Sequence, residues 1–101
     1  MSLEKAMRSN RLFDVYSDLL TLRQIEVFKY YYHEDFTYQE IADLLGISKA
    51  AVYDNITKTV HILEEYEEKL HLLNLIEELK SCNDDAIKEI LKKNIPGGNY
   101  E

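Results

Sequence analysis

Hydrophobic positions recur every three or four residues along most of the chain, and this spacing predicts amphipathic α-helices. The first such segment covers residues 3–20, and its apolar stripe consists of Leu12, Phe13, Tyr16, Leu19 and Leu20. A second helix is predicted over residues 22–32, because Thr21 and Gln24 have the spacing of a capping box. Its side chains expected to face the core are Leu22, Ile25, Phe28 and Tyr32.

Residues 37–60 predict two short helices that meet across a tight turn, a helix-turn-helix. Thr37 and Glu40 form a second capping-box pattern at the start of the first helix. Gly46 follows that helix, at a point where a chain commonly needs a positive φ angle. Ser48 can then cap the second helix.

The helical pattern continues beyond residue 60, and its apolar stripe is wide. Glutamates lie mostly on the opposite side, at positions 64, 65, 67, 68, 77 and 78. The second helix therefore either continues as one long element or breaks within residues 71–74. A stripe of this width folds back onto the first helix or is buried against a second copy of the chain. The stripe consists of Ile56, Ile62, Leu63, Tyr66, Leu70, Leu72, Leu73, Ile76 and Leu79.

A last short helix can begin at Asn83 or Asp84, and Pro96 with the two following glycines ends the helical pattern. We therefore predict an all-α fold. Residues 1–95 are expected to form a single helical domain, and residues 96–101 a flexible tail.

Composition fits a globular protein, since 46% of the residues are hydrophobic and 31% are charged. No apolar run is long enough to span a bilayer, and the charged N-terminal segment does not read as an export signal. Cys82 is the single cysteine, which excludes an internal disulfide and favours a reducing compartment. We expect a cytoplasmic protein without membrane contact.

The net charge of −7 is unevenly distributed. Residues 1–60 carry 7 basic and 9 acidic side chains, whereas residues 61–101 carry 5 and 10. A nucleic-acid-binding surface is normally basic, so the acidic C-terminal part would repel a duplex unless it points away from it. The densest basic cluster is Lys5, Arg8 and Arg11; we interpret it as a solvated face balancing Glu4, Asp14 and Asp18, and the alternative is a phosphate-contacting edge.

No pattern typical of catalysis is present in the sequence. It contains no glycine-rich phosphate loop, no paired-cysteine metal motif and no serine nucleophile elbow. The three histidines, His33, His61 and His71, are scattered along the chain. We therefore predict a protein that is not an enzyme, with no catalytic residue, metal site or cofactor.

If the second helix of the motif contacts a duplex, its exposed N-terminal side chains are expected to make the contacts. Lys49 and Lys58 would contact phosphates, and Asp54 could accept a hydrogen bond from a cytosine amino group. The predicted nucleic-acid-binding residues are Ser48, Lys49, Ala50, Tyr53, Asp54, Thr57 and Lys58.

The stretch from Leu22 to Val60 resembles the promoter-reading region four of bacterial sigma factors, a winged-helix-like class of helix-turn-helix. Joined to the following HILEEYEEKLHLL, it resembles more closely the YlxM family of small Gram-positive proteins. The most specific signs are the AVYDNI run at Ala51–Ile56 and the EEYEEKL run at Glu64–Leu70. The resemblance implies an all-helical cytoplasmic protein whose gene lies beside those of the signal recognition particle GTPase and its receptor. It therefore implies a role in that pathway, with particle components as partners.

Two functions follow from these observations. In the first, the protein is a DNA-binding or RNA-binding regulator linked to the signal recognition particle. In the second, it is a protein-interaction module that uses its acidic helical tail without touching nucleic acid. In either case the C-terminal apolar stripe can serve as a homodimer contact.

Overall fold

The computed structural model describes residues 2–94, and every regular element in this range is a helix. The elements are α1 (Leu3–Tyr16), the 3₁₀ turn η1 (Ser17–Leu19), α2 (Leu22–Tyr32), α3 (Tyr38–Leu45), α4 (Lys49–Leu70), α5 (Leu72–Ser81) and α6 (Asp85–Asn94). The predicted all-α fold is confirmed. Residues 2–94 contain no β-strand, so the winged-helix-like part of the prediction is wrong for this range.

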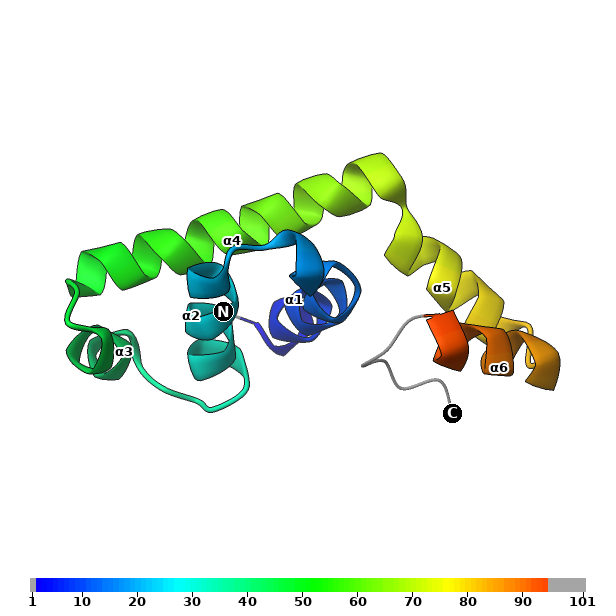
Figure 1. The fold of residues 1–101 in the computed structure, drawn as a ribbon, viewed down its shortest axis with the longest axis horizontal. Coiled ribbons are helices and arrows are strands. Elements are labelled where there is room, and N and C mark those ends of the chain that lie inside the picture. Colours follow the sequence, from blue (N-terminus) through cyan, green and yellow to red (C-terminus); the bar gives the residue numbers. More distant parts are fainter. Residues whose placement is uncertain (1, 95–101) are drawn as a thin grey trace.

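The molecule is elongated, with principal extents of 47 × 25 × 25 Å. Helix α4 runs along one side of it, and α1, α2 and α3 pack beneath it (Figure 1). Helices α5 and α6 form a separate pair at the other end, beyond a sharp corner where α4 stops (Figure 1). One long helix therefore connects a helix-turn-helix end to a C-terminal end.

Local sequence explains the N-terminal helices. Both predicted capping boxes are present: Thr21 with Gln24, and Thr37 with Glu40, each exchange hydrogen bonds of 2.9–3.1 Å. Gly46 ends α3 in the left-handed region, with φ of 69°. These contacts confirm the predicted boundaries of α2 and of the turn between α3 and α4.

Two hydrophobic clusters share α4. One lies under the helix-turn-helix and the other where α1 and α2 cross α4; the second includes Leu63, so the predicted stripe does fold back onto the N-terminal helices. The cluster under the motif contains Val27, Ile41, Ala42, Val52 and Ile56. The crossing cluster contains Leu12, Phe13, Tyr16, Leu20, Phe28, Leu63 and Leu73.

Two leucines predicted to face the core are exposed instead. Leu19 is 55% exposed and Leu22 is 86% exposed. The first helix ends at Tyr16, and the 3₁₀ turn that follows breaks the α-helical spacing on which Leu19 was placed. Leu22 is the first residue of α2 and lies on its outer side.

The predicted second helix of the motif continues for 22 residues and ends at Leu70. His71 then adopts a left-handed conformation (φ 56°, ψ 26°) and the chain turns into α5. Both open alternatives therefore hold in part, because the helix runs on past residue 60 and breaks at the start of the predicted 71–74 interval. The predicted tail, residues 96–101, lies outside the described residues.

Candidate nucleic-acid interface

All seven predicted contact residues lie at the free end of α4 and are exposed there. Ser48 is already engaged as a cap, since its Oγ accepts a hydrogen bond of 3.0 Å from the backbone N–H of Ala51. Lys49 and Ala50 occupy the first turn of the helix, and the other four follow over the next two turns. The N-terminal turns of α4 are thus exposed to solvent, the placement from which helix-turn-helix proteins contact the major groove.

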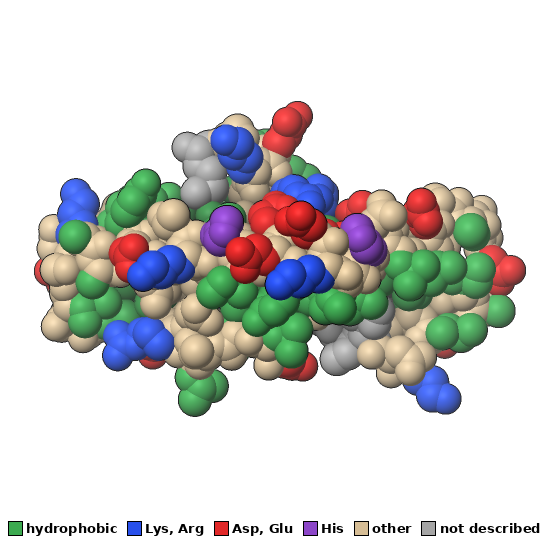
Figure 2. Space-filling model, turned by 90° about the horizontal axis from the view of Figure 1, so that it is seen from above, with side chains coloured by type: hydrophobic (Ala, Val, Ile, Leu, Met, Phe, Trp, Pro, Cys, Tyr) green, Lys and Arg blue, Asp and Glu red, His purple; other side chains and the backbone are tan. Residues whose placement is uncertain are grey.

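The charge on this surface is close to neutral. Lys58, predicted as a phosphate contact, pairs with Asp54 one turn away at 2.9 Å. Lys49 has no ion pair within the described part of the chain. The preceding helix adds exposed carboxylates at Glu40 and Asp43. Acidic and basic side chains are intermixed along α4 in Figure 2, which does not show a continuous basic area on this face.

A chain of tyrosines supports the motif from behind. The rings of Tyr31 and Tyr38 are stacked with centroids 4.9 Å apart, and Tyr38 meets the exposed Tyr53 edge to face at 5.6 Å. The hydrogen bond between Tyr38 and Tyr31, together with burial, raises the pKa of Tyr38 to about 12. Tyr38 is therefore a neutral phenol at physiological pH. Its ring contacts that of Tyr53 edge to face.

Two arginines of the basic cluster of α1 form ion pairs with other helices. Both oxygens of Glu64 accept hydrogen bonds from the Arg8 guanidinium, at 2.8 and 3.0 Å. Arg11 pairs with Glu77 at 3.3 Å. The expectation that the cluster balances Glu4, Asp14 and Asp18 is wrong for these two arginines, because α1 lies against α4 and α5 and more distant acids come within reach.

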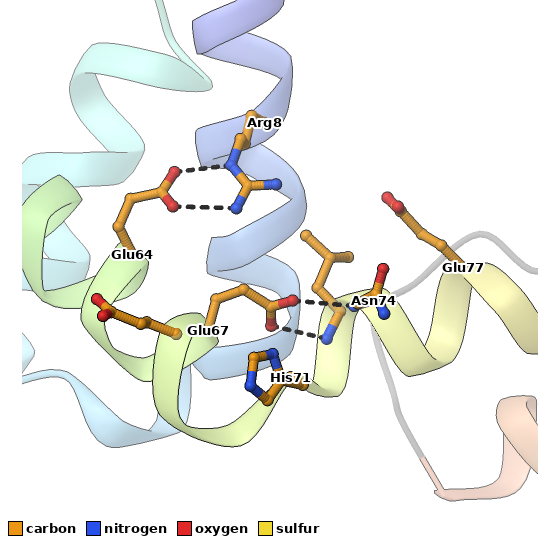
Figure 3. Close-up of a pocket in the computed structure, with 8 residues that line it drawn as sticks. Arg8, Glu64, Glu67, His71, Asn74 and Glu77 are labelled. Atoms are coloured by element: carbon orange, nitrogen blue, oxygen red, sulfur yellow. Dashed lines mark hydrogen bonds and ion pairs between the residues drawn. The ribbon is translucent and has the colours of Figure 1, made fainter.

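Glu67 is the most important residue that the sequence pattern placed wrongly. It was expected on the solvent-facing acidic side, but it is only 7% exposed. Its Oε1 accepts hydrogen bonds from the Tyr16 hydroxyl at 2.6 Å and from the Leu73 N–H at 2.9 Å, and its Oε2 accepts one from the Asn74 N–H at 3.0 Å. Figure 3 shows this carboxylate pointing at the first turn of α5.

The same contacts replace the missing N-cap of α5. The residue at the cap position, His71, makes no side-chain cap. The Tyr16 oxygen accepts the Leu72 N–H at 3.1 Å, so the first three N–H groups of α5 all have partners from outside that helix. A signal was available in the sequence: Glu67 follows the buried Leu63 by four residues and therefore lies on the same helix face.

The hydrogen bonds also set the ionisation of this pair. Burial disfavours the charged carboxylate, but the hydrogen bonds from Tyr16, Leu73 and Asn74 outweigh it and lower the pKa of Glu67. Burial, reinforced by the bond to Glu67, raises the pKa of Tyr16 to about 12. The corner therefore holds a carboxylate and a neutral phenol at physiological pH.

Beyond this corner the apolar stripe is only partly covered. Leu70, Leu72 and Leu75 are 50%, 40% and 49% exposed. Apolar side chains gather toward the α5–α6 end of the molecule in Figure 2, next to the acidic side chains of α4. This uncovered stretch is called the corner leucines below.

His33 packs against side chains of α1 and α2. His33 lies with its Nε2 2.9 Å from the Asn10 side-chain oxygen, and its ring packs edge-on against Phe13 and Phe28. Residues 2–94 contain no group of three or more potential metal ligands placed to hold an ion. They also contain no helix long and apolar enough to cross a membrane.

The capped helices, the left-handed glycine and the exposed start of α4 define a helix-turn-helix protein. A family model described as "Putative helix-turn-helix protein, YlxM / p13 like" matches residues 3–96. The chain belongs to this YlxM/p13-like family, as its resemblance predicted.

Named relatives support the assignment. The UPF0122 protein YlxM of Bacillus subtilis is 51% identical over 80 residues, which cover 79% of this chain and 73% of the relative. The UPF0122 protein YofM of Lactococcus lactis subsp. lactis is 46% identical over 94 residues, covering 92% and 80%. A UPF0122 protein of Shouchella clausii is 49% identical over 88 residues, covering 87% and 81%.

Proposed function

We propose that this protein is a cytoplasmic nucleic-acid-binding regulator that presents the first three turns of α4 to DNA, or to RNA. The observation that carries the proposal is the placement of all seven candidate side chains, exposed, at the end of α4 held by Gly46 and the Ser48 cap. Only two lysines serve this surface and one of them is paired, so we expect weak binding whose affinity falls with a shallow slope as salt rises.

Fluorescence anisotropy with a labelled random DNA duplex and a labelled signal recognition RNA, titrated from low salt upward, tests this proposal. Affinity is expected to fall as salt rises, and to weaken in the double variant Lys49→Ala plus Lys58→Ala. The matched control is Lys92→Ala plus Lys93→Ala, which removes the same charge from exposed positions of α6. Absence of binding at low salt, or equal losses in both double variants, would contradict the proposal.

The family resemblance supports a place for this activity in the signal recognition particle pathway. Genes of the family typically lie beside those of the particle's GTPase and its receptor. We propose that the particle's components are the partners of this chain. The RNA arm of the titration addresses that point, because preference for signal recognition RNA over random duplex at equal salt is expected only if the particle is the target.

A second candidate is a protein-interaction module in which the helix-turn-helix is a scaffold. The corner leucines favour it, because apolar side chains exposed together commonly mark a contact with another protein. A basic protein, or a second copy of this chain, could cover them beside the acids of α4. Sedimentation velocity over a range of protein concentrations distinguishes these two occupants. A dimer that is lost in Leu72→Asp plus Leu75→Asp supports self-association, and a monomer at every concentration excludes it.

A further inference from the structure

A groove of about 360 Å³ opens between α1 and α4, beside the candidate nucleic-acid interface. Its volume lies within the range of roughly 300–1,000 Å³ that small-molecule sites occupy. Its walls come from four helices, and the side chains that line it include Lys5, Ser9, Tyr32, Tyr38, Tyr53 and Thr57. Most of this surface is tyrosine ring and hydrocarbon, which suits a flat apolar body.

The groove is largely preformed. Tyr38 is fixed by its stack on Tyr31 and by the hydrogen bond between their hydroxyls. Tyr32 is fixed by a side-chain hydrogen bond with Ser9, which is only 4% exposed. Tyr53 is 56% exposed, so its ring is open to a ligand on the groove side. Aromatic walls that are already ordered cost little conformational entropy when a ring binds against them.

The charge of its lining distinguishes this groove from the hollow at the corner. The hollow at the corner, about 400 Å³, is lined by Arg8 and by the carboxylates of residues 64, 67, 68 and 77 (Figure 3). The groove is lined by Lys5 and Arg8 with Glu64 as its one acid. Glu64 neutralises Arg8, whereas Lys5 has no ion pair among residues 2–94. The groove thus has a surplus positive charge in a chain of net charge −7.

We propose that this groove binds a small ligand composed of a planar aromatic ring and one anionic group, with the ring against Tyr53 and Tyr38 and the anion at Lys5. The site overlaps the proposed nucleic-acid contact at Tyr53 and Thr57, and the rest of its lining lies outside that contact. Any effect on nucleic-acid binding rests on the proposed function: a bound ligand would occupy these two side chains and compete with nucleic acid for them.

A pair of fluorescent probes tests the two parts of the proposal separately. 1-Anilinonaphthalene-8-sulfonate carries the ring system and an anion, and N-phenyl-1-naphthylamine is the same ring system without the sulfonate. With the purified full chain, the sulfonate is expected to bind at one site about tenfold more tightly than the neutral probe, as a charge-assisted contact predicts.

The variants then assign the contacts. Lys5→Ala is expected to reduce sulfonate affinity to that of the neutral probe and to leave neutral-probe affinity unchanged, whereas Tyr53→Ala weakens both. Both positions are exposed, and circular dichroism verifies folding. The control Leu72→Ser plus Leu75→Ser is expected to change neither probe. Equal affinity of the two probes for the unaltered chain, no effect of Lys5→Ala, or loss of binding in the leucine control would overturn the proposal.

Discussion

The two ends of α4 are held in different ways. At the helix-turn-helix end, every turn is closed by groups close in sequence: Thr37 with Glu40, Gly46, and Ser48 with Ala51. At the corner, the first turn of α5 is closed by Glu67 and by Tyr16. Tyr16 lies more than fifty residues from both of its partners, Glu67 and Leu72. One end is therefore specified locally and the other by tertiary packing.

This difference predicts which substitutions should reduce the stability of the domain most. Local caps are individually worth about 1 kcal/mol and can be replaced by solvent. A buried carboxylate that satisfies three donors cannot be replaced in this way, because its removal leaves those donors desolvated and unpaired. The substitutions below should reproduce this order, from the corner to the surface of α4.

Glu67→Ala is expected to have the largest effect. It leaves the Tyr16 hydroxyl and two backbone N–H groups of α5 without an acceptor, at a cost of roughly 3 kcal/mol in the free energy of unfolding. Urea unfolding followed by circular dichroism measures this cost. Glu65→Ala is the control, because that carboxylate is exposed on the same helix; similar losses in the two variants would show that the corner network contributes nothing special.

Gly46→Val is expected to cost roughly 2 kcal/mol, because a β-branched residue is poorly tolerated at positive φ. A Cβ at this position would meet no atom within 4 Å, so the penalty is one of backbone conformation and not of collision. Thermal unfolding checks it, and Gly46→Asn is the matched variant, because asparagine tolerates the left-handed region. Unchanged stability of Gly46→Val would refute the role of this turn.

Glu67→Gln is expected to have a smaller effect on the free energy of unfolding than the two substitutions above, and this effect should depend on pH. Folding lowers the pKa of Glu67 from its ordinary value of 4.5, so its carboxylate stabilises the fold fully above that value. The contribution is lost as pH falls through the folded-state pKa. Glu67→Gln is expected to cost about 1–2 kcal/mol at pH 7. The difference between this variant and the unaltered chain should narrow as pH falls below 4.5, and a constant difference across the range would contradict the assignment.

Lys58→Ala is expected to have the smallest effect on stability. Its pair with Asp54 is exposed on both sides, and such pairs contribute less than about 0.5 kcal/mol. Thermal unfolding in low and high salt tests this expectation. A loss above that limit would mean that the free end of α4 depends on its charges as the corner depends on Glu67, and would remove the contrast between the two ends.

The sequence predicted the locally determined end well. The capping boxes, the bounds of α2 and the glycine turn are each decided by residues within four positions of one another, so spacing alone identifies them. The exposure of the seven candidate residues, Ser48 at the cap and six in α4, followed from the same spacing.

The corner could not be predicted in the same way. Glu67 lies within a run of glutamates. Its spacing from Leu63 places it on the core-facing side of α4, but the position at which α1 crosses α4 decides that it is buried and which groups it binds. The partners of Arg8 and Arg11 and the exposure of Leu22 depend on the same long-range packing. The groove beside Tyr53 is likewise absent from the sequence pattern, because it is formed by four helices that meet only in the folded chain.

The uninterrupted length of α4 restricts how this protein can tolerate insertions. Each residue added within the helix rotates everything beyond it by about 100°. A single insertion before Glu67 would therefore carry its carboxylate a quarter turn or more away from Tyr16, and α5 would leave the corner in a new direction. Seven added residues would restore the phase to within about 20°. The same seven residues would also move Glu67 about 10 Å along the helix axis, out of reach of Tyr16, so the corner requires an α4 of unchanged length between its two ends.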